Sequence, residues 1–170
     1  MILPNVEIEV IALCAAWSDS LPHAENVARH IARLALARGR SKASLALPEQ
    51  VELTIVLADD AEQRQLNHIW RGVDRPTNVL AFLAWAPGAA VPSDGPFLLG
   101  DVVLAFETVV REANEQDKAL ADHFGHLIVH GVLHLLGYDH MGDMEAVEME
   151  RLETSILAEL GVADPYRGTM

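Results

Sequence analysis

The side chains with the clearest chemical meaning lie in the segment HGVLHLLGYDH, residues 130–140. His130 and His134 are four residues apart, so on a predicted helix both imidazoles project from one face. Helices commonly supply two ligands to one metal ion in this way. Gly137 is expected to end the helix, and the turn after it can bring His140 towards the same point. Three neutral imidazoles favour zinc, one ion per chain, and leave one coordination position open.

His126 lies one helical turn before His130 and competes for the third ligand position. Residues 126 and 134 are eight residues apart, which corresponds to about 12 Å along a helix. All ligands of one zinc ion lie about 2 Å from it. A straight helix cannot bring three such side chains that close, so we interpret His123 and His126 as structural histidines.

The histidine spacing matches the zinc-peptidase pattern H-E-x-x-H-x-x-G-x-x-H with one departure. Gly131 stands where that pattern has its general-base glutamate. Asp139 and Asp143 are the nearest carboxylates that could replace this base. Their expected roles, however, are to orient an imidazole N–H group or to cap the last helix.

A second chemical feature is the segment LNHIWRGVDRPTNVLAF, residues 66–82. Arg71 is predicted at the end of a helix, just before a turn, and its planar guanidinium suits a phosphate group. Thr77 and Asn78 follow Pro76 in that turn and can form local hydrogen bonds. They are candidates for substrate contact or for support of a ligand.

Strands and helices alternate along the first two thirds of the chain, and helices dominate the rest. This order predicts an α+β fold with a small mixed sheet of about four strands, helices packed on it, and one domain covering 1–170. The metal site is expected on a helix of the C-terminal half and the following turn. Hydrophobic periodicity predicts strands at 6–13, 51–58, 78–83 and 99–106, helices at 23–39, 107–117, 119–136 and 143–160, a helix capped by Asp59 or Asp60 and ended by Gly72, and a loop at 85–98.

The composition excludes several classes of protein. The chain has 170 residues, 51% of them hydrophobic, and a single cysteine, so a disulfide framework and a zinc site of several thiolates are excluded. No apolar run approaches the length of a membrane span, and the N-terminal residues do not resemble a signal peptide. We therefore expect a cytoplasmic protein without a membrane partner.

The net charge of −13 disfavours general binding to a phosphate backbone. Residues 29–42 are an exception, because they hold five basic side chains and no acidic one. This basic stripe is either a solvated helix face or a surface that guides RNA. Its members are Arg29, Arg33, Arg38, Arg40 and Lys42.

These segments together resemble the YbeY family of bacterial ribosomal-RNA maturation endoribonucleases. The motif H-G-x-L-H-L-x-G-Y-D-H matches residues 130–140 at every specified position, and the LN…R…D-x-P-T and LGD segments follow the family order. The resemblance implies a zincin-like fold, zinc on His130, His134 and His140, and single-strand-specific cleavage of RNA. It also implies a role at the 3′ end of small-subunit ribosomal RNA and in ribosome quality control. Arg71 and His134 are the residues expected to act in catalysis.

The resemblance further implies ribosomal RNA or the small ribosomal subunit as partner, with a ribosomal protein or a GTPase as a second candidate. One departure concerns the segment after Pro76, where the family usually reads T-D-V-L-S-F. This chain has Asn78 in place of the aspartate and Ala81 in place of the serine. Asn78 removes a charge, and Ala81 removes a hydroxyl group.

Two alternative functions remain open from the sequence. One is a metallohydrolase that acts on peptides or other amides, which the histidine spacing supports and Gly131 weakens. The other is a non-catalytic ribosome-assembly factor with a structural zinc ion, in which Asp139 or Asp143 closes the coordination sphere.

Overall fold

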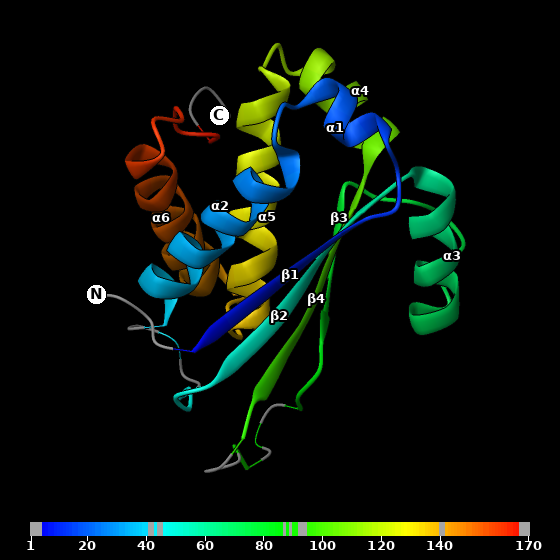
Figure 1. Cartoon of the computed structure of the whole chain (residues 1–170). Coiled ribbons are helices and arrows are strands. Elements are labelled where there is room, and N and C mark those ends of the chain that lie inside the picture. The colour runs from blue at the N-terminus through cyan, green and yellow to red at the C-terminus, as the bar shows by residue number, and fades with distance from the viewer. Residues whose placement is uncertain are drawn as a thin grey trace.

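Four strands form one mixed sheet at the centre of the computed structural model (Figure 1). The structure describes residues 5–40, 43, 46–86, 88, 90–91, 95–139 and 142–166. The strand order is β1-β2-β4-β3, with the first three strands parallel and β3 antiparallel to β4 at one edge. The strands are β1 (Val6–Ala12), β2 (Val51–Ala58), β3 (Val79–Leu83) and β4 (Phe97–Ala105).

Helices cover the two faces of this sheet unequally. Helices α2, α5 and α6 lie on one side, and α3 lies on the other (Figure 1). The helices of the described residues are α1 (Ala16–Ser20), α2 (Ala24–Gly39), α3 (Asp60–Arg71), α4 (Phe106–Glu115), α5 (Leu120–Leu135) and α6 (Asp143–Glu159). None of them is long and apolar enough to cross a membrane.

The predicted α+β class, the mixed sheet and the order of the elements are confirmed. Two details differ from the prediction. The strand β4 begins at Phe97, two residues before the expected start, and therefore takes the end of the predicted 85–98 loop. The short helix α1 was not predicted, because five residues without a side-chain cap give little periodic signal. It is anchored by Trp17, which is fully buried and donates its indole N–H to the carbonyl of Ala58 at 2.9 Å.

Close packing between α2 and α5 fixes the position of the histidine-bearing helix. Gly39 is the last residue of α2 and is buried against α5. A Cβ atom at Gly39 would lie 2.7 Å from Cδ atoms of both Leu133 and Leu136. Arg40, rather than this glycine, is the C-cap residue of α2. The absence of a side chain at Gly39 instead lets the two helices approach each other.

Candidate metal centre

The helix α5 carries His126, His130 and His134 and ends where the sequence predicts. Gly137 adopts a φ of 98°, and the N–H of Tyr138 closes the helix end on the carbonyl of Leu133 at 3.1 Å. A positive φ is readily adopted only by glycine, which explains why the helix stops there. His140 lies outside the described residues, so its role as a ligand stays a prediction.

The rings of His130 and His134 lie edge to face, with their planes at 80° and their centres 4.5 Å apart. Their Nε2 atoms are 3.0 Å apart. Both residues line a cavity of about 310 Å³, together with Gly131 and Arg71. The remaining lining comes from the edge strand β3, through Val79, Leu80, Ala81 and Leu83.

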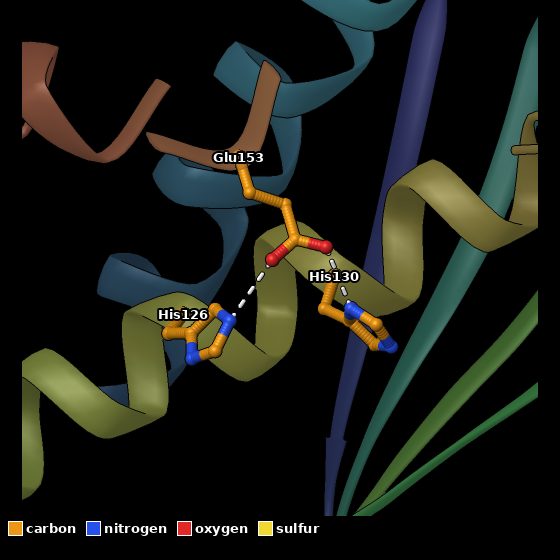
Figure 2. A group of neighbouring side chains, drawn as sticks. All are labelled: His126, His130 and Glu153. Carbon is orange, nitrogen blue, oxygen red and sulfur yellow. Dashed lines mark hydrogen bonds and ion pairs between the residues drawn. The ribbon is translucent and has the colours of Figure 1, made fainter. Parts of the chain in front are cut away.

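A buried carboxylate holds the other side of His130. Glu153 of α6 is fully buried, and its carboxylate lies between the imidazoles of His126 and His130 (Figure 2). Its Oε1 atom is 2.7 Å from Nδ1 of His130, and its Oε2 atom is 2.9 Å from Nε2 of His126. Burial raises the pKa of Glu153, but the hydrogen bonds from His126, His130 and Tyr166 outweigh it and lower the pKa to about 2. The carboxylate is therefore ionised at neutral pH.

These three residues form a group that could hold a metal ion. Potential ligand atoms of His126, His130 and Glu153 all lie within 4.8 Å of one another. The sequence predicts a structural role for His126 and does not indicate Glu153 as a site residue. The available signal was the position of Glu153 on the apolar face of α6, where the other buried residues are Met149, Ile156 and Leu157.

The two ring nitrogens of His130 have different partners, and this difference indicates which nitrogen would bind a metal ion. A neutral ring that donates from Nδ1 to Glu153 keeps a lone pair on Nε2, the atom that faces His134. Two nitrogens that bind one zinc ion at about 2.0–2.1 Å lie roughly 3.3 Å apart. The observed 3.0 Å between the Nε2 atoms is close to this value. Zinc-binding histidines commonly donate their second N–H group to a carboxylate, so the His130–His134 pair fits zinc.

Arg71 reaches the same cavity from α3. Asp59 caps the start of this helix by accepting from the N–H of Glu62 at 2.7 Å, and Gly72 ends it with a φ of 70°, both as predicted. The guanidinium of Arg71 donates to the carbonyl of Ala81 at 3.1 Å and lies 5.3 Å from the ring centre of Phe82. It is thus held over the edge strand β3.

Arg71 also lines a second, larger hollow on the α3 side of the sheet, with a volume of about 830 Å³. Ala81 and Leu83 line both spaces, so the two meet at β3. The larger hollow is mainly apolar and includes the exposed Trp70. Asp101 is its one acidic described lining residue, and burial raises the pKa of this carboxyl group.

Thr77 and Asn78 are engaged with neighbouring protein groups. The N–H of Thr77 donates to the side chain of Gln63 at 2.7 Å. The amide of Asn78 donates to Glu112 Oε1 at 2.9 Å, and the same oxygen lies 2.9 Å from Nε2 of His123. His123 is buried, and this burial lowers its pKa. The three residues Asn78, Glu112 and His123 form a polar network beside the start of β3.

The two aspartates near the predicted turn are exposed. Asp143 is the first residue of α6, whose N-cap is Gly142, so its charge favours the helix dipole without a side-chain cap. Asp139 precedes residues 140–141, which the structure does not describe. Whether either aspartate orients a ligand stays a prediction.

The described part of the basic stripe, residues 29–40, lies along α2 and its C-cap residue, and Arg29 and Arg38 contact protein groups. Arg29 donates to the carbonyl of Ile8 at 3.1 Å, and Arg38 forms a bidentate ion pair with Glu159, with both N–O distances at 2.8 Å. Arg33 is exposed and Arg40 half-buried. Lys42 lies outside the described residues. Guidance of RNA by this stripe stays a prediction.

The packing of α5 on the sheet explains the glycine in the histidine motif. Gly131 is buried, and a Cβ atom there would lie 2.6 Å from Cγ1 of Val102 in β4. No side chain fits at this point without a shift of the helix or the strand. A glutamate at position 131, as in the zinc-peptidase pattern, would therefore require Val102 or one of the two elements to shift.

Comparisons with known proteins show the family of the chain. Residues 19–161 match the model of the family described as Endoribonuclease YbeY. An Endoribonuclease YbeY of Paramagnetospirillum magneticum is 55% identical, over 95% of this chain and 96% of its own length. An Endoribonuclease YbeY of a Bradyrhizobium species is 50% identical, over 96% and 93%.

The solution structure of TM1509 from Thermotoga maritima has the same fold, with a TM-score of 0.56 at 18% identity over 93% of this chain and 97% of that one. The family match covers most of the chain, including all four histidines of α5 and the strands β2, β3 and β4. The chain belongs to the YbeY endoribonuclease family.

Proposed function

We propose that this protein is a zinc-dependent endoribonuclease that cleaves single-stranded RNA. The observation that carries the proposal is the pair of Nε2 atoms of His130 and His134, 3.0 Å apart, in a cavity that Arg71 also lines. His140 is the proposed third ligand of one zinc ion per chain. The family membership supports the assignment, because the relatives at 50–55% identity are named as endoribonucleases.

The residues proposed for the site have different roles, which follow from their chemistry. His130, His134 and His140 would hold the ion, which when bound supplies Lewis acidity for phosphodiester cleavage. Arg71 offers several N–H donors in a plane and would hold a phosphate oxygen of the substrate. Its contacts with Ala81 and Phe82 hold the guanidinium at β3, whose residues also line the cavity.

The substrate proposed here is ribosomal RNA, with processing of the 3′ end of the small-subunit RNA and ribosome quality control as the cellular roles. The partners would be the small ribosomal subunit and a ribosomal protein or a GTPase that delivers the substrate, in the cytoplasm. A delivering partner is consistent with the net charge of −13, which by itself repels RNA.

A cleavage assay tests the proposal directly. Zinc-loaded wild type, His134→Ala and Arg71→Ala would be incubated with single-stranded and structured ribosomal RNA, with casein as a control substrate. We expect the wild type to cleave single-stranded RNA, and the loss of either side chain to reduce the rate by about 10²-fold or more. The exposed His68 of α3 provides the matched control His68→Ala, which should cleave like the wild type.

Three outcomes would count against the proposal. Equal cleavage by wild type and His134→Ala would indicate a contaminating ribonuclease. The absence of cleavage in all variants would favour the non-catalytic assembly factor with a structural zinc ion. Hydrolysis of casein would favour the peptidase alternative, which the packing of Gly131 against Val102 disfavours.

A further inference from the structure

Glu153 is a buried charge that the proposed chemistry does not use. Its side chain is 1% exposed, and it stands among apolar residues of α6. An ionised carboxylate in such a place is stable only when its oxygens are well paired. The structure gives it three donors from two other parts of the chain: His126, His130 and Tyr166.

The three donors are divided unequally between the two oxygens. Oε1 accepts from Nδ1 of His130 at 2.7 Å. Oε2 accepts from Nε2 of His126 at 2.9 Å and from the hydroxyl of Tyr166. The contacts at Oε2 hold the carboxylate in place, so Oε1 has a fixed direction towards His130.

The fixed position of Oε1 sets the tautomer and the orientation of the His130 imidazole. The neutral imidazole must keep its proton on Nδ1 to donate to Oε1, and its lone pair then lies on Nε2. That lone pair is directed to the side where Nε2 of His134 lies 3.0 Å away. A ring that rotated or shifted its proton would lose both the hydrogen bond and this alignment.

We propose that Glu153 is a positioning residue that sets the tautomer and the orientation of His130 for metal binding, with His126 and Tyr166 holding its carboxylate. The proposal rests on the function proposed above, because it needs His130 and His134 to share an ion. It also assigns a structural task to His126, in place of the direct ligand role that its nearness to His130 and Glu153 permits.

Zinc affinity measured by competition with a coloured chelator tests this assignment without any activity assay. The variant Glu153→Gln keeps the size of the side chain but removes its charge and one acceptor. We expect zinc binding to weaken about 10- to 100-fold, the usual effect of removing a partner of a metal-binding histidine. We expect His134→Ala to weaken it further, and His126→Gln to weaken it only a few-fold.

The chain offers a matched control, a second carboxylate that contacts a histidine of α5. Glu112 binds Nε2 of the buried His123 at 2.9 Å, so Glu112→Gln makes the same chemical change beside another histidine of α5. It should leave the zinc affinity within about two-fold of the wild-type value. Circular dichroism of each metal-free variant shows whether it has folded.

Nitrogen NMR of histidine-labelled wild type supplies a second measurement that needs no variant. The hydrogen bonds predict a proton on Nδ1 of His130 and on Nε2 of His123 and His126. The zinc-loaded protein should keep the His130 proton on Nδ1. A proton on Nε2 of His130 in the zinc-loaded protein would overturn the proposal even if Glu153→Gln failed to fold.

The outcomes separate this proposal from the one it rests on. If His134→Ala loses zinc while Glu153→Gln binds it like the wild type, the positioning role is wrong and the proposed metal site stands. If His134→Ala binds zinc normally while Glu153→Gln and His126→Gln lose it, Glu153 and His126 are ligands themselves. That result would overturn both proposals.

Discussion

The side-chain amide of Asn78 donates to the same oxygen of Glu112 that accepts from His123. The family pattern usually has aspartate at this position, and an aspartate here would bring a second carboxylate to Glu112. An amide suits the site better because it supplies a donor. The departure at position 78 is thus explained by the local hydrogen bonding in this chain.

The substitution Asn78→Asp should therefore lower the free energy of unfolding at pH 7 by about 1–3 kcal/mol, since it loses a hydrogen bond and adds a like charge. Urea unfolding measures this value. Asn78→Ala is the control, because it removes the hydrogen bond without adding charge, and it should cost less. An aspartate variant as stable as the wild type would mean that Glu112 does not face position 78 in solution.

His123 should make the stability depend on pH. Burial lowers its pKa below the ordinary value of 6.5, which the unfolded chain keeps. The unfolded state therefore binds more protons as the pH falls below 6.5, so this contribution to stability is present above that pH and is lost below it. Urea unfolding at a series of pH values should show a smaller loss for His123→Gln. Equal losses in both proteins would contradict the prediction.

At the scale of the elements, the contact between α5 and β4 sets the place of the histidine motif. Gly131→Ala should lower the free energy of unfolding by roughly 1–2 kcal/mol, because overpacking against Val102 outweighs the better helix propensity of alanine. The experiment is a double-mutant cycle in urea. In a Val102→Ala background, the same change should become neutral or stabilising by up to about 1 kcal/mol. Additive effects would mean that the helix does not touch Val102.

Most elements could be predicted from the sequence because their periodicity is strong. The strand β2 alternates buried and half-buried residues, and α3 has both an Asp59 cap and a terminal glycine. The helix α1 is five residues long, which is too short for a periodic pattern. The start of β4 at Phe97 could not be predicted, because the pair Gly95-Pro96 directly before it indicates a loop.

Less of the candidate site than of the fold could be predicted from the sequence. The spacing of His130 and His134 predicted that their rings share one face, and their Nε2 atoms do meet. Glu153 could not be identified, because α6 carries several glutamates and only the packing against α5 decides which one is buried. The same packing gives His126 a partner that no local pattern indicates.

At the scale of the whole molecule, acidic charge is unevenly distributed. Residues 101–170 hold 14 acidic and four basic side chains, whereas the basic stripe of residues 29–42 holds five basic side chains and no acidic one. We expect weak binding of single-stranded RNA that falls steeply with salt, measured by fluorescence anisotropy. If the stripe guides RNA, Arg33→Gln should reduce the salt dependence more than Arg38→Gln, because Arg38 is already paired with Glu159. Equal, unchanged slopes would place RNA binding elsewhere.

Removal of zinc should leave the fold intact while lowering its stability. The largest buried side chains include Trp17, Ile55 and Phe124, which belong to the hydrophobic core and do not line the cavity of His130 and His134. A chelator should therefore remove zinc without loss of the helical circular dichroism signal. Zinc at 100 times its dissociation constant should then stabilise the protein by about 2.7 kcal/mol, which raises the melting temperature.

The variant His134→Ala separates stabilisation by zinc bound at this site from unspecific effects of the ion. Because it lacks one of the facing nitrogens, its melting temperature should be insensitive to zinc, although the metal-free protein folds like the wild type. Unfolding of the wild type by the chelator would instead make zinc part of the fold, as in structural zinc sites. That result would count against an open catalytic site and in favour of the assembly factor, since a site that the fold requires has its coordination positions closed by protein.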